Sequence, residues 1–190
     1  GGGSVIDSAP SYGEAERIVG ELLSSLGARN KTFLATKITT RGDRNEGIQS
    51  MKESAKRLKT DHFELMQVHN LKNLGTHLKS IRELRDAGKT KYVGVTHFRP
   101  GAYERLEKVL KSEPLDFVQL KYSLSTREAA DRLLPLAKDK GVAVLINRPY
   151  DLGRLFRAVK GKSLPPWAAD FGAESWGQFF LKFILGHDAV

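Results

Sequence analysis

Six short runs of apolar and β-branched residues recur along the chain, and this alternation constrains the fold more than any other feature. One run follows the next after roughly 25–30 residues, the size of a strand with its crossover helix. Strands that alternate with helices form a parallel sheet covered by helices. The runs are Val5-Ile6, Thr32–Ile38, Phe63–Val68, Tyr92–Thr96, Phe117–Tyr122 and Val142–Ile146.

The segments between these runs carry apolar residues at intervals of three and four, which predicts amphipathic helices. Segment 149–174 is different, because Pro165-Pro166 and several glycines predict a long irregular loop there. The apolar stripes are Ile18, Leu22 and Leu26, with Val19 and Leu23 beside them; Ile48, Met51, Ala55 and Leu58; Tyr103, Leu106 and Leu110; and Trp176, Phe179, Phe180, Phe183 and Ile184, the last of which we expect to pack in the core.

Two α/β architectures fit repeated strand–helix units: an open doubly wound sheet and a (β/α)8 TIM barrel. An open dinucleotide-binding sheet would carry G-x-G-x-x-G directly after its first strand. Here Gly1-Gly2-Gly3 precede the first strand, either as an engineered linker or as the turn that leads into it. Regular unit length and polar strand ends favour an incomplete barrel of about six βα units, forming one domain over residues 1–190.

Composition excludes several classes of protein. An apolar fraction of 40% is too high for a disordered chain, and the absence of cysteine excludes disulfides and thiol chemistry. No apolar stretch approaches the ~20 residues of a membrane span. The net charge of +9 is spread singly over polar helix faces, which favours a solvated surface over an anion-binding patch or a nucleic-acid partner.

Polar residues follow the predicted strands, at the edge where barrels place their active sites. Asp7 ends the first run, Lys37 lies at the end of the second, and His69 follows the third. Further strand-end residues are Asn70, Thr96, His97, Gln119, Tyr122, Asn147 and Arg148.

Tyr12 follows Asp7 by five residues, in a turn where Ser11 and Glu14 have the spacing of a helix capping box. Taken singly, Asp7 could be a helix cap, Lys37 a surface charge and His69 a structural histidine. Together with Tyr12 they suggest proton-transfer chemistry. A lysine cation helps a tyrosine to give up its proton, an aspartate keeps the lysine charged, and a histidine orients a carbonyl oxygen.

Two rival chemistries were considered for the same residues. Metal binding is disfavoured, because the chain has no H-E-x-x-H motif, no cysteine and no close His/carboxylate spacing on one helix. A Schiff base on Lys37 is the stronger rival, since barrel aldolases place a lysine at a strand end. That role leaves the pairing of Asp7 with Tyr12 unexplained.

These motifs resemble the aldo-keto reductase family, in particular its bacterial members. The resemblance implies a (β/α)8 barrel that reduces small aldehydes and ketones with NADPH or NADH. It also implies that Tyr12 donates the proton, that Lys37 and Asp7 tune it, and that His69 orients the substrate carbonyl. The matching segments, in order along essentially the whole chain, are Val5–Gly13, Ala35-Thr36-Lys37, Gln67–Asn70, Gly94–Phe98, Gln119 and Asn147-Arg148-Pro149.

The resemblance also implies the cofactor contacts, with two departures from the family pattern. The family's nicotinamide-binding Ser-Asn pair reads Thr96-His97 here, and Gln119 matches the third nicotinamide contact. The family's ring-stacking tyrosine aligns with Asn147. Arg148 is expected to contact a phosphate or the substrate.

Length predicts that two barrel units are absent. A complete barrel has about 250 residues, so eight units take about 31 each, and 190 residues fall short by about two units. The resemblance places the family's first unit before Gly1 and its last, with the loop that grips the adenosine phosphate, after Val190. We therefore expect an isolated chain with two unpaired strand edges to be unstable or aggregation-prone, unless another chain fills the gap, and to bind dinucleotide weakly.

Two other functional assignments are also compatible with the sequence. The chain could belong to a cofactor-binding regulatory barrel with vestigial activity, or to an inactive fragment. Cytoplasmic localisation is the expectation, while the sequence specifies neither the substrate nor the oligomeric state.

Overall fold

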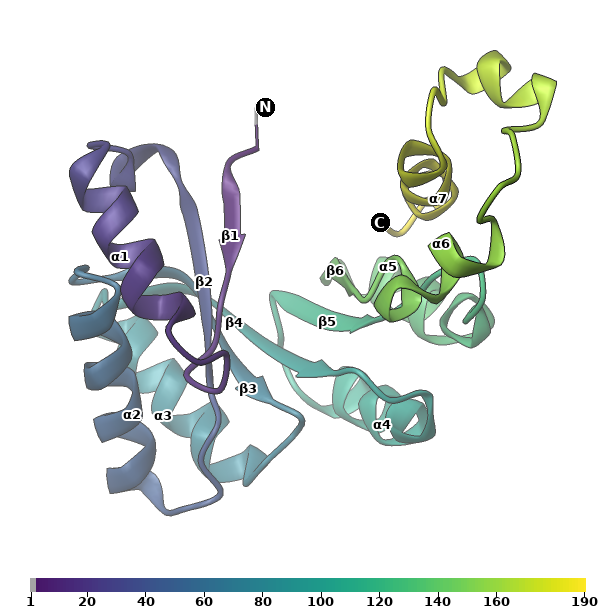
Figure 1. Ribbon diagram of the computed structural model, residues 1–190. Coiled ribbons are helices and arrows are strands. Elements are labelled where there is room, and N and C mark those ends of the chain that lie inside the picture. Colours follow the sequence, from purple (N-terminus) through teal and green to yellow (C-terminus); the bar gives the residue numbers. More distant parts are fainter. Residues whose placement is uncertain (1–2) are drawn as a thin grey trace. The chain divides into compact units, whose positions relative to one another are not determined.

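The computed structural model describes residues 3–190, so Gly1 and Gly2 of the predicted linker or turn lie outside the described residues. The chain is an α/β protein that divides into two compact units, residues 1–96 and 97–190. The boundary falls at the end of strand β4. Figure 1 shows strands alternating with helices through both units.

The first unit is a sheet of four parallel strands with helices packed on one face (Figure 1). Its strands pair in chain order, β1 with β2, β2 with β3, and β3 with β4. Strands β2 and β3 are buried along most of their length, as expected for a parallel sheet. The elements are β1 Val5–Asp7, α1 Ala15–Ser25, β2 Phe33–Ile38, α2 Arg44–Arg57, β3 Phe63–His69, α3 Leu74–Asp86 and β4 Thr90–His97, with a 3-10 turn at Arg29–Lys31.

The second unit continues the alternation with two parallel strands, β5 and β6, which pair with each other. Its core includes Leu106 and Leu110 from α4, Val118 and Leu120 from β5, and Phe180 from α7. The elements are α4 Tyr103–Ser112, β5 Phe117–Lys121, α5 Leu133–Asp139, β6 Ala143–Asn147, α6 Arg154–Ala158 and α7 Trp176–Leu185, with 3-10 turns at Pro100–Ala102, Glu128–Ala130, Asp151–Gly153 and Pro166–Phe171.

All six predicted strands are present, and their bounds differ from the apolar runs by two residues at most. Two local expectations are wrong. Segment 149–174 is not simply irregular, because it contains α6 and the 3-10 helix Pro166–Phe171. Ser11 and Glu14 do not form a capping box: helix α1 begins at Ala15, and no side chain caps it. The reason is Gly13, whose φ of +59° interrupts the helical backbone after Ser11.

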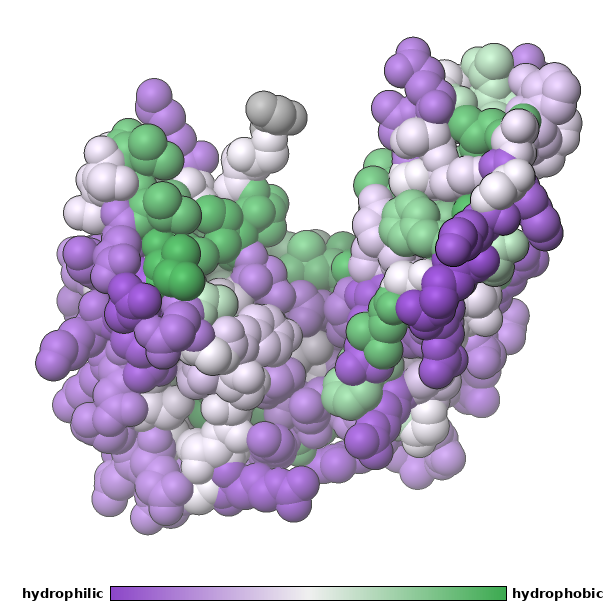
Figure 2. Space-filling view, in the orientation of Figure 1, coloured by the Kyte–Doolittle hydropathy of each residue, from purple (hydrophilic) through white to green (hydrophobic). Residues whose placement is uncertain are grey.

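Helix α1 buries only part of its apolar surface, and Leu23 is its buried apolar residue. Ile18, Leu22 and Leu26 are 45%, 53% and 74% exposed. Figure 2 shows hydrophobic residues at the surface over α1. The buried face carries Glu16, Gly20 and Leu23. A Cβ at Gly20 would lie 2.3 Å from the carbonyl oxygen of Arg57, so glycine is what allows α1 to touch the end of α2.

Glu16 is the centre of a buried polar network that ties α1 to β2 and α2. Its carboxylate is 1% exposed and accepts hydrogen bonds from Thr36 Oγ1 at 2.6 Å, Ser54 Oγ at 3.3 Å and Arg57 Nε at 2.8 Å. A buried carboxylate is tolerated only with such partners. Because Glu16 lies in the first turn of α1, the network also fixes the helix end that follows the Tyr12 turn.

Glu16→Ala is expected to lower the free energy of unfolding by roughly 3–5 kcal/mol, because the buried hydroxyls of Thr36 and Ser54 lose their acceptor and Arg57 Nε loses its 2.8 Å hydrogen bond. Urea unfolding of the full-length gene product measures this loss. The matched control is Glu21→Ala, since Glu21 is half exposed and pairs with Arg17 at the surface. That change should cost no more than about 1 kcal/mol. Equal losses for the two variants would contradict a structural role for the network.

His77 is a second buried titratable group, located where α3 packs on α2. Its side chain is fully buried, Nε2 lies 3.3 Å from the Thr40 carbonyl oxygen, and a Cβ at Gly47 would lie 2.7 Å from Nδ1. Burial lowers the pKa of His77 below its ordinary value, against smaller opposing effects of the Thr40 carbonyl and the Glu46 carboxylate. The folded protein therefore holds this imidazole neutral.

This histidine makes stability depend on pH in a defined direction. The unfolded chain takes up a proton at the ordinary histidine pKa and the folded chain at a lower one, so stability is complete above roughly pH 6.5 and falls below it, by at most about 1.4 kcal/mol per pH unit. His77→Gln keeps a donor for Thr40 without titrating, and should show a smaller loss between roughly pH 7 and pH 5 in urea unfolding. The same pH dependence in both proteins would exclude His77 as its source.

Candidate active site

One face of the first unit's sheet gathers polar side chains at the carboxyl ends of the strands. The register pairs Asp7 with Ala35, Lys37 with Gln67, and His69 with Thr96. Side chains alternate between faces along a strand, while paired residues share one. The polar residues that share the face are therefore Asp7 of β1, Lys37 of β2, Gln67 and His69 of β3, and Thr96 of β4.

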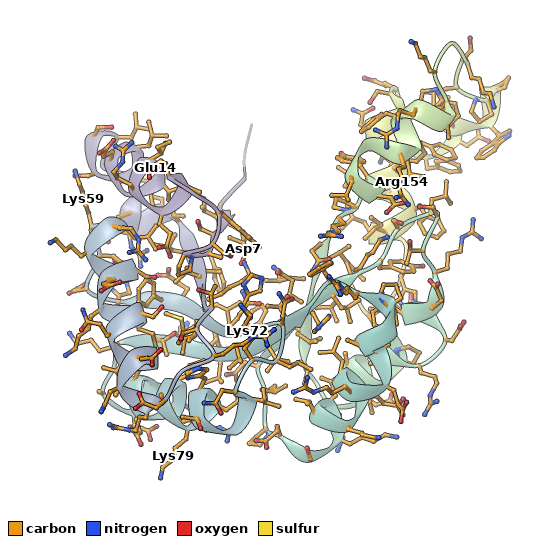
Figure 3. The ribbon with its side chains drawn as sticks, turned by 60° about the horizontal axis from the view of Figure 1, so that its bottom comes forward. Asp7, Glu14, Lys59, Lys72, Lys79 and Arg154 are labelled. Atoms are coloured by element: carbon orange, nitrogen blue, oxygen red, sulfur yellow. The ribbon has the colours of Figure 1, made fainter. Side chains whose placement is uncertain are left out.

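Lys37 is the buried centre of this cluster. The residue is 1% exposed, and its ammonium donates to Asp7 Oδ2 at 2.6 Å and to the Ser8 carbonyl oxygen at 2.8 Å. A buried ammonium needs an opposite charge and hydrogen-bond acceptors, and Asp7 and Ser8 supply both. In Figure 3 Asp7 lies among other side chains at the end of β1, whereas Lys59 and Lys79 project outward.

Tyr12 reaches the cluster from the turn between β1 and α1. Its backbone N–H donates to the Ala9 carbonyl oxygen at 3.0 Å, which holds the turn closed. Lys37 Nζ lies 4.8 Å from the centre of the Tyr12 ring, and the His69 ring meets Tyr12 edge to face at 6.1 Å. Tyr12 is 47% exposed, so the phenol faces solvent on one side and a buried cation on the other. The structure thus places the four residues selected from the sequence in one cluster.

Gln67 is a member of the cluster to which the sequence assigned no role. It is fully buried, and Nε2 donates to Asp7 Oδ1 at 3.0 Å. The available signal was its position two residues before His69, because residues i and i+2 of a strand share a face. A polar side chain in an otherwise apolar buried strand is the kind of exception that marks a site.

Buried polar atoms and backbone strain accumulate at the same edge. Within residues 3–190, Ser8 Oγ, Gln67 Oε1 and Asn70 Oδ1 are buried without a hydrogen-bond partner. Each such atom costs about 1–3 kcal/mol. Leu71, in the loop after His69, has a φ of +54°, which is costly for a residue with a branched side chain. Such local costs are typical of functional sites.

Of the residues assigned to cofactor binding, Thr96 lies in the first unit and is 2% exposed. His97 and Arg148 lie in the second unit, where both contact Phe98. The His97 ring stacks on the Phe98 ring at 5.9 Å, and the Arg148 guanidinium lies 3.9 Å from the centre of the Phe98 ring. This contact brings His97 and Arg148 to the same aromatic ring.

His97 is held neutral and in one tautomer. Burial lowers its pKa, and the nearby charges of Arg105 and Arg99 lower it further. The backbone N–H of Arg99 donates to His97 Nδ1 at 3.2 Å, so in the neutral ring Nε2 carries the hydrogen. A hydrogen-bond donor therefore stands where the family pattern has an asparagine amide.

Gln119 and Asn147 share a face of the second unit's sheet, because Lys121 pairs with Asn147 and lies two residues after Gln119. The sequence did not suggest the ion pair beside them: Lys121 Nζ donates to Asp151 Oδ1 at 2.6 Å, and Ser125 donates to the same carboxylate at 3.2 Å. The Lys121 hydrogen bond is the main cause of the lowered pKa of Asp151.

Two kinds of feature are absent from residues 3–190. No helix in this range is long and apolar enough to cross a membrane. The same range contains no group of three His, Asp or Glu side chains suited to hold a metal ion.

The fold and the cluster define a parallel strand–helix protein with a candidate proton-donating site. A family model described as the Aldo/keto reductase family matches residues 1–165. The chain therefore belongs to the aldo/keto reductase family.

Curated relatives agree with this assignment. Aldo-keto reductase YhdN of Bacillus subtilis (strain 168) is 33% identical over 157 residues, which cover 75% of this chain and 46% of that protein. NADH-specific methylglyoxal reductase of Escherichia coli (strain K12) is 27% identical over 189 residues, covering 85% of this chain and 57% of the relative. The chain thus spans about half the length of the curated relatives it matches.

Solved structures show the same fold. An aldo-keto reductase from Klebsiella pneumoniae in complex with NADPH has a TM-score of 0.81 at 22% identity, covering 98% of this chain and 67% of that one. The holo form of aldo-keto reductase AKR11C1 from Bacillus halodurans has a TM-score of 0.67 at 25% identity, covering 86% and 55%. These likenesses confirm the predicted fold class, part of a (β/α)8 barrel.

Proposed function

We propose that the full-length protein reduces small aldehydes or ketones with NADPH or NADH, with Tyr12 as the proton donor. The observation that carries the proposal is the contact of the half-exposed Tyr12 ring with the buried Lys37 ammonium, 4.8 Å from the ring centre. A phenol beside a fixed cation can release a proton, because the positive charge stabilises the phenolate that remains.

The other two residues of the cluster have complementary roles. Asp7 accepts the Lys37 hydrogen bond at 2.6 Å and keeps the ammonium in place beneath Tyr12. His69 lies edge to face with Tyr12 and is suited to direct a carbonyl oxygen towards the phenol hydroxyl. Proton transfer from Tyr12 Oη to that oxygen then neutralises the alkoxide that forms during reduction.

The environment of Lys37 argues against the Schiff-base alternative. A Schiff base forms from a neutral amine with a free lone pair. The Lys37 side chain is 0% exposed and its ammonium donates to the Asp7 carboxylate and the Ser8 carbonyl oxygen. Attack on a substrate carbonyl would require breaking both hydrogen bonds and moving a buried nitrogen.

The nicotinamide cofactor supplies the hydride when it is bound, and several residues of the second unit suit such a ligand. His97 presents an Nε2–H donor for a carboxamide oxygen. Asn147 Oδ1 is buried without a partner among the described residues, and so can accept from an amide N–H. Arg148 carries a charge that matches a phosphate group. Of the similar proteins, the Klebsiella enzyme is in complex with NADPH, and the Escherichia coli reductase is NADH-specific.

The test is hydride transfer by the full-length gene product against a panel of simple aldehydes and ketones. With a nicotinamide deuterated at C4, the expected result is deuterium on the carbinol carbon of the product. Borohydride trapping with the substrate should leave Lys37 unmodified. Trapped Lys37 would support the Schiff-base alternative. Cofactor binding with no turnover over the whole panel would support a regulatory barrel and refute the proposal.

A further inference from the structure

We propose that Gln67 is a positioning residue for the proton-donating site. Its side-chain amide fixes the Asp7 carboxylate so that the opposite oxygen holds the Lys37 ammonium beneath Tyr12. The inference rests on the proposed function and extends it to a residue outside the Asp7, Tyr12, Lys37 and His69 cluster.

The geometry gives the two oxygens of Asp7 different partners. Oδ1 accepts from Gln67 Nε2 at 3.0 Å, and Oδ2 accepts from Lys37 Nζ at 2.6 Å. A carboxylate on a short strand end can rotate about its Cβ–Cγ bond, and Asp7 is the last residue of the three-residue strand β1. The amide opposes this rotation from β3, where Gln67 pairs directly with Lys37 in the register.

The orientation of the amide follows from its partner. An ionised carboxylate only accepts hydrogen bonds, so Gln67 must turn Nε2 towards Asp7 and Oε1 away from it. Oε1 is then buried without a hydrogen-bond partner within residues 3–190. A glutamine retained for packing alone would be replaced at less cost by an apolar residue of the same size. The contact with Asp7 accounts for an amide at this position.

The neutrality of the amide also matters. A second carboxylate here would face Asp7 and compete for the Lys37 ammonium, while a second cation would compete for Asp7. Glutamine orients the carboxylate without changing the charge of the pair, so the Lys37 ammonium keeps Asp7 as its counter-charge beside Tyr12.

The experiment compares Gln67→Leu with Gln49→Leu in the full-length gene product. Gln49 is the matched control, because its Nε2 also donates to a carboxylate, Glu53 Oε1 at 3.0 Å, on the exposed surface of α2. Gln67→Leu should lower kcat about tenfold, the effect of losing one hydrogen bond to a charged group, and leave cofactor Kd unchanged. Gln49→Leu should leave both unchanged. Equal kcat values for wild type and Gln67→Leu would overturn the proposal.

A double-mutant cycle separates positioning from general stability. In an Asp7→Asn background, Gln67→Leu should change kcat by no more than about twofold, because the group that it positions is already altered. The same tenfold loss in both backgrounds would show a merely structural role. Gln67→Glu should in addition displace the pH profile of kcat, and an unchanged profile would contradict the charge argument.

A readout independent of turnover distinguishes this inference from the proposed function. The NMR signal of the Gln67 side-chain amide should move when Asp7 is replaced by asparagine, while that of Gln49 stays in place. If the wild type reduces no carbonyl, the proposed function fails, and this shift still decides whether Gln67 holds Asp7. An unmoved Gln67 signal refutes the positioning role even in an active enzyme.

Discussion

Tyr12→Phe is expected to lower kcat for carbonyl reduction by roughly 10²–10⁴, the usual contribution of a positioned general acid. Phenylalanine keeps the ring that contacts Lys37 and His69 and removes only the hydroxyl. The turn is held by a backbone hydrogen bond to Ala9, which the substitution leaves intact. Cofactor Kd and the unfolding midpoint should therefore stay close to the wild-type values, so that the loss is confined to kcat.

The control for this variant is Tyr92→Phe, which makes the same chemical change elsewhere in the first unit. Tyr92 stacks on Phe33 at 6.1 Å, and Phe33 is the first residue of β2, at the opposite end of that strand from Lys37. This variant should retain wild-type kcat. Retained turnover in Tyr12→Phe would remove Tyr12 from the proton-donor role, whatever the result for Tyr92.

Lys37→Met is expected to lower kcat by roughly 10²–10³, as when a preorganised electrostatic group is removed from an active site. Methionine fills much of the same space, but leaves Asp7 without the ammonium and Tyr12 without the nearby cation. Lys37→Arg should not restore activity, because the side chain is 0% exposed and leaves no room for the larger guanidinium. Steady-state and single-turnover rates measure both effects.

Lys79→Met serves as the control for loss of a lysine. Lys79 lies on α3, and its side chain projects into solvent (Figure 3). Its kcat should equal that of the wild type. A Lys37→Met enzyme that keeps more than about a tenth of wild-type kcat would show that the charge near Tyr12 is not needed for catalysis.

The sequence alone was sufficient to predict the strands and the meeting of Asp7, Lys37 and His69 at one edge of the sheet. The apolar runs are long and regularly spaced, and parallel strands bring their carboxyl ends to one edge, so Asp7, Lys37 and His69 had to meet. Tyr12 lies in the turn between β1 and α1 as expected, although the capping box that supported this expectation does not form. Its role and those of its neighbours stay predictions until the variants above are assayed.

The buried face of a helix and the contacts of a buried side chain depend on packing between distant segments, and the sequence did not predict them. Helix α1 has apolar residues on more than one face, and the close approach at Gly20 buries the face with Glu16 and Leu23 while Ile18 and Leu22 stay exposed. The role of Gln67 depends on its pairing with Lys37 in the register between β2 and β3. The sequence of one strand does not determine that pairing. Ser11 and Glu14 have the spacing of a capping box, but the left-handed backbone at Gly13 prevents the box from forming.

Two adjacent residues of strand β2 make hydrogen bonds on opposite faces of the sheet. Thr36 points towards the helices and binds Glu16, and Lys37 points to the other face and binds Asp7. A shift of β2 by one position would exchange them, burying an ammonium against the helices and leaving a hydroxyl at the proton-donating edge. A one-residue shift of β2 is therefore unfavourable at Thr36 and at Lys37, and each residue helps to fix the register that places the other. The position of the Lys37 ammonium is consequently fixed by contacts on both sides of the sheet.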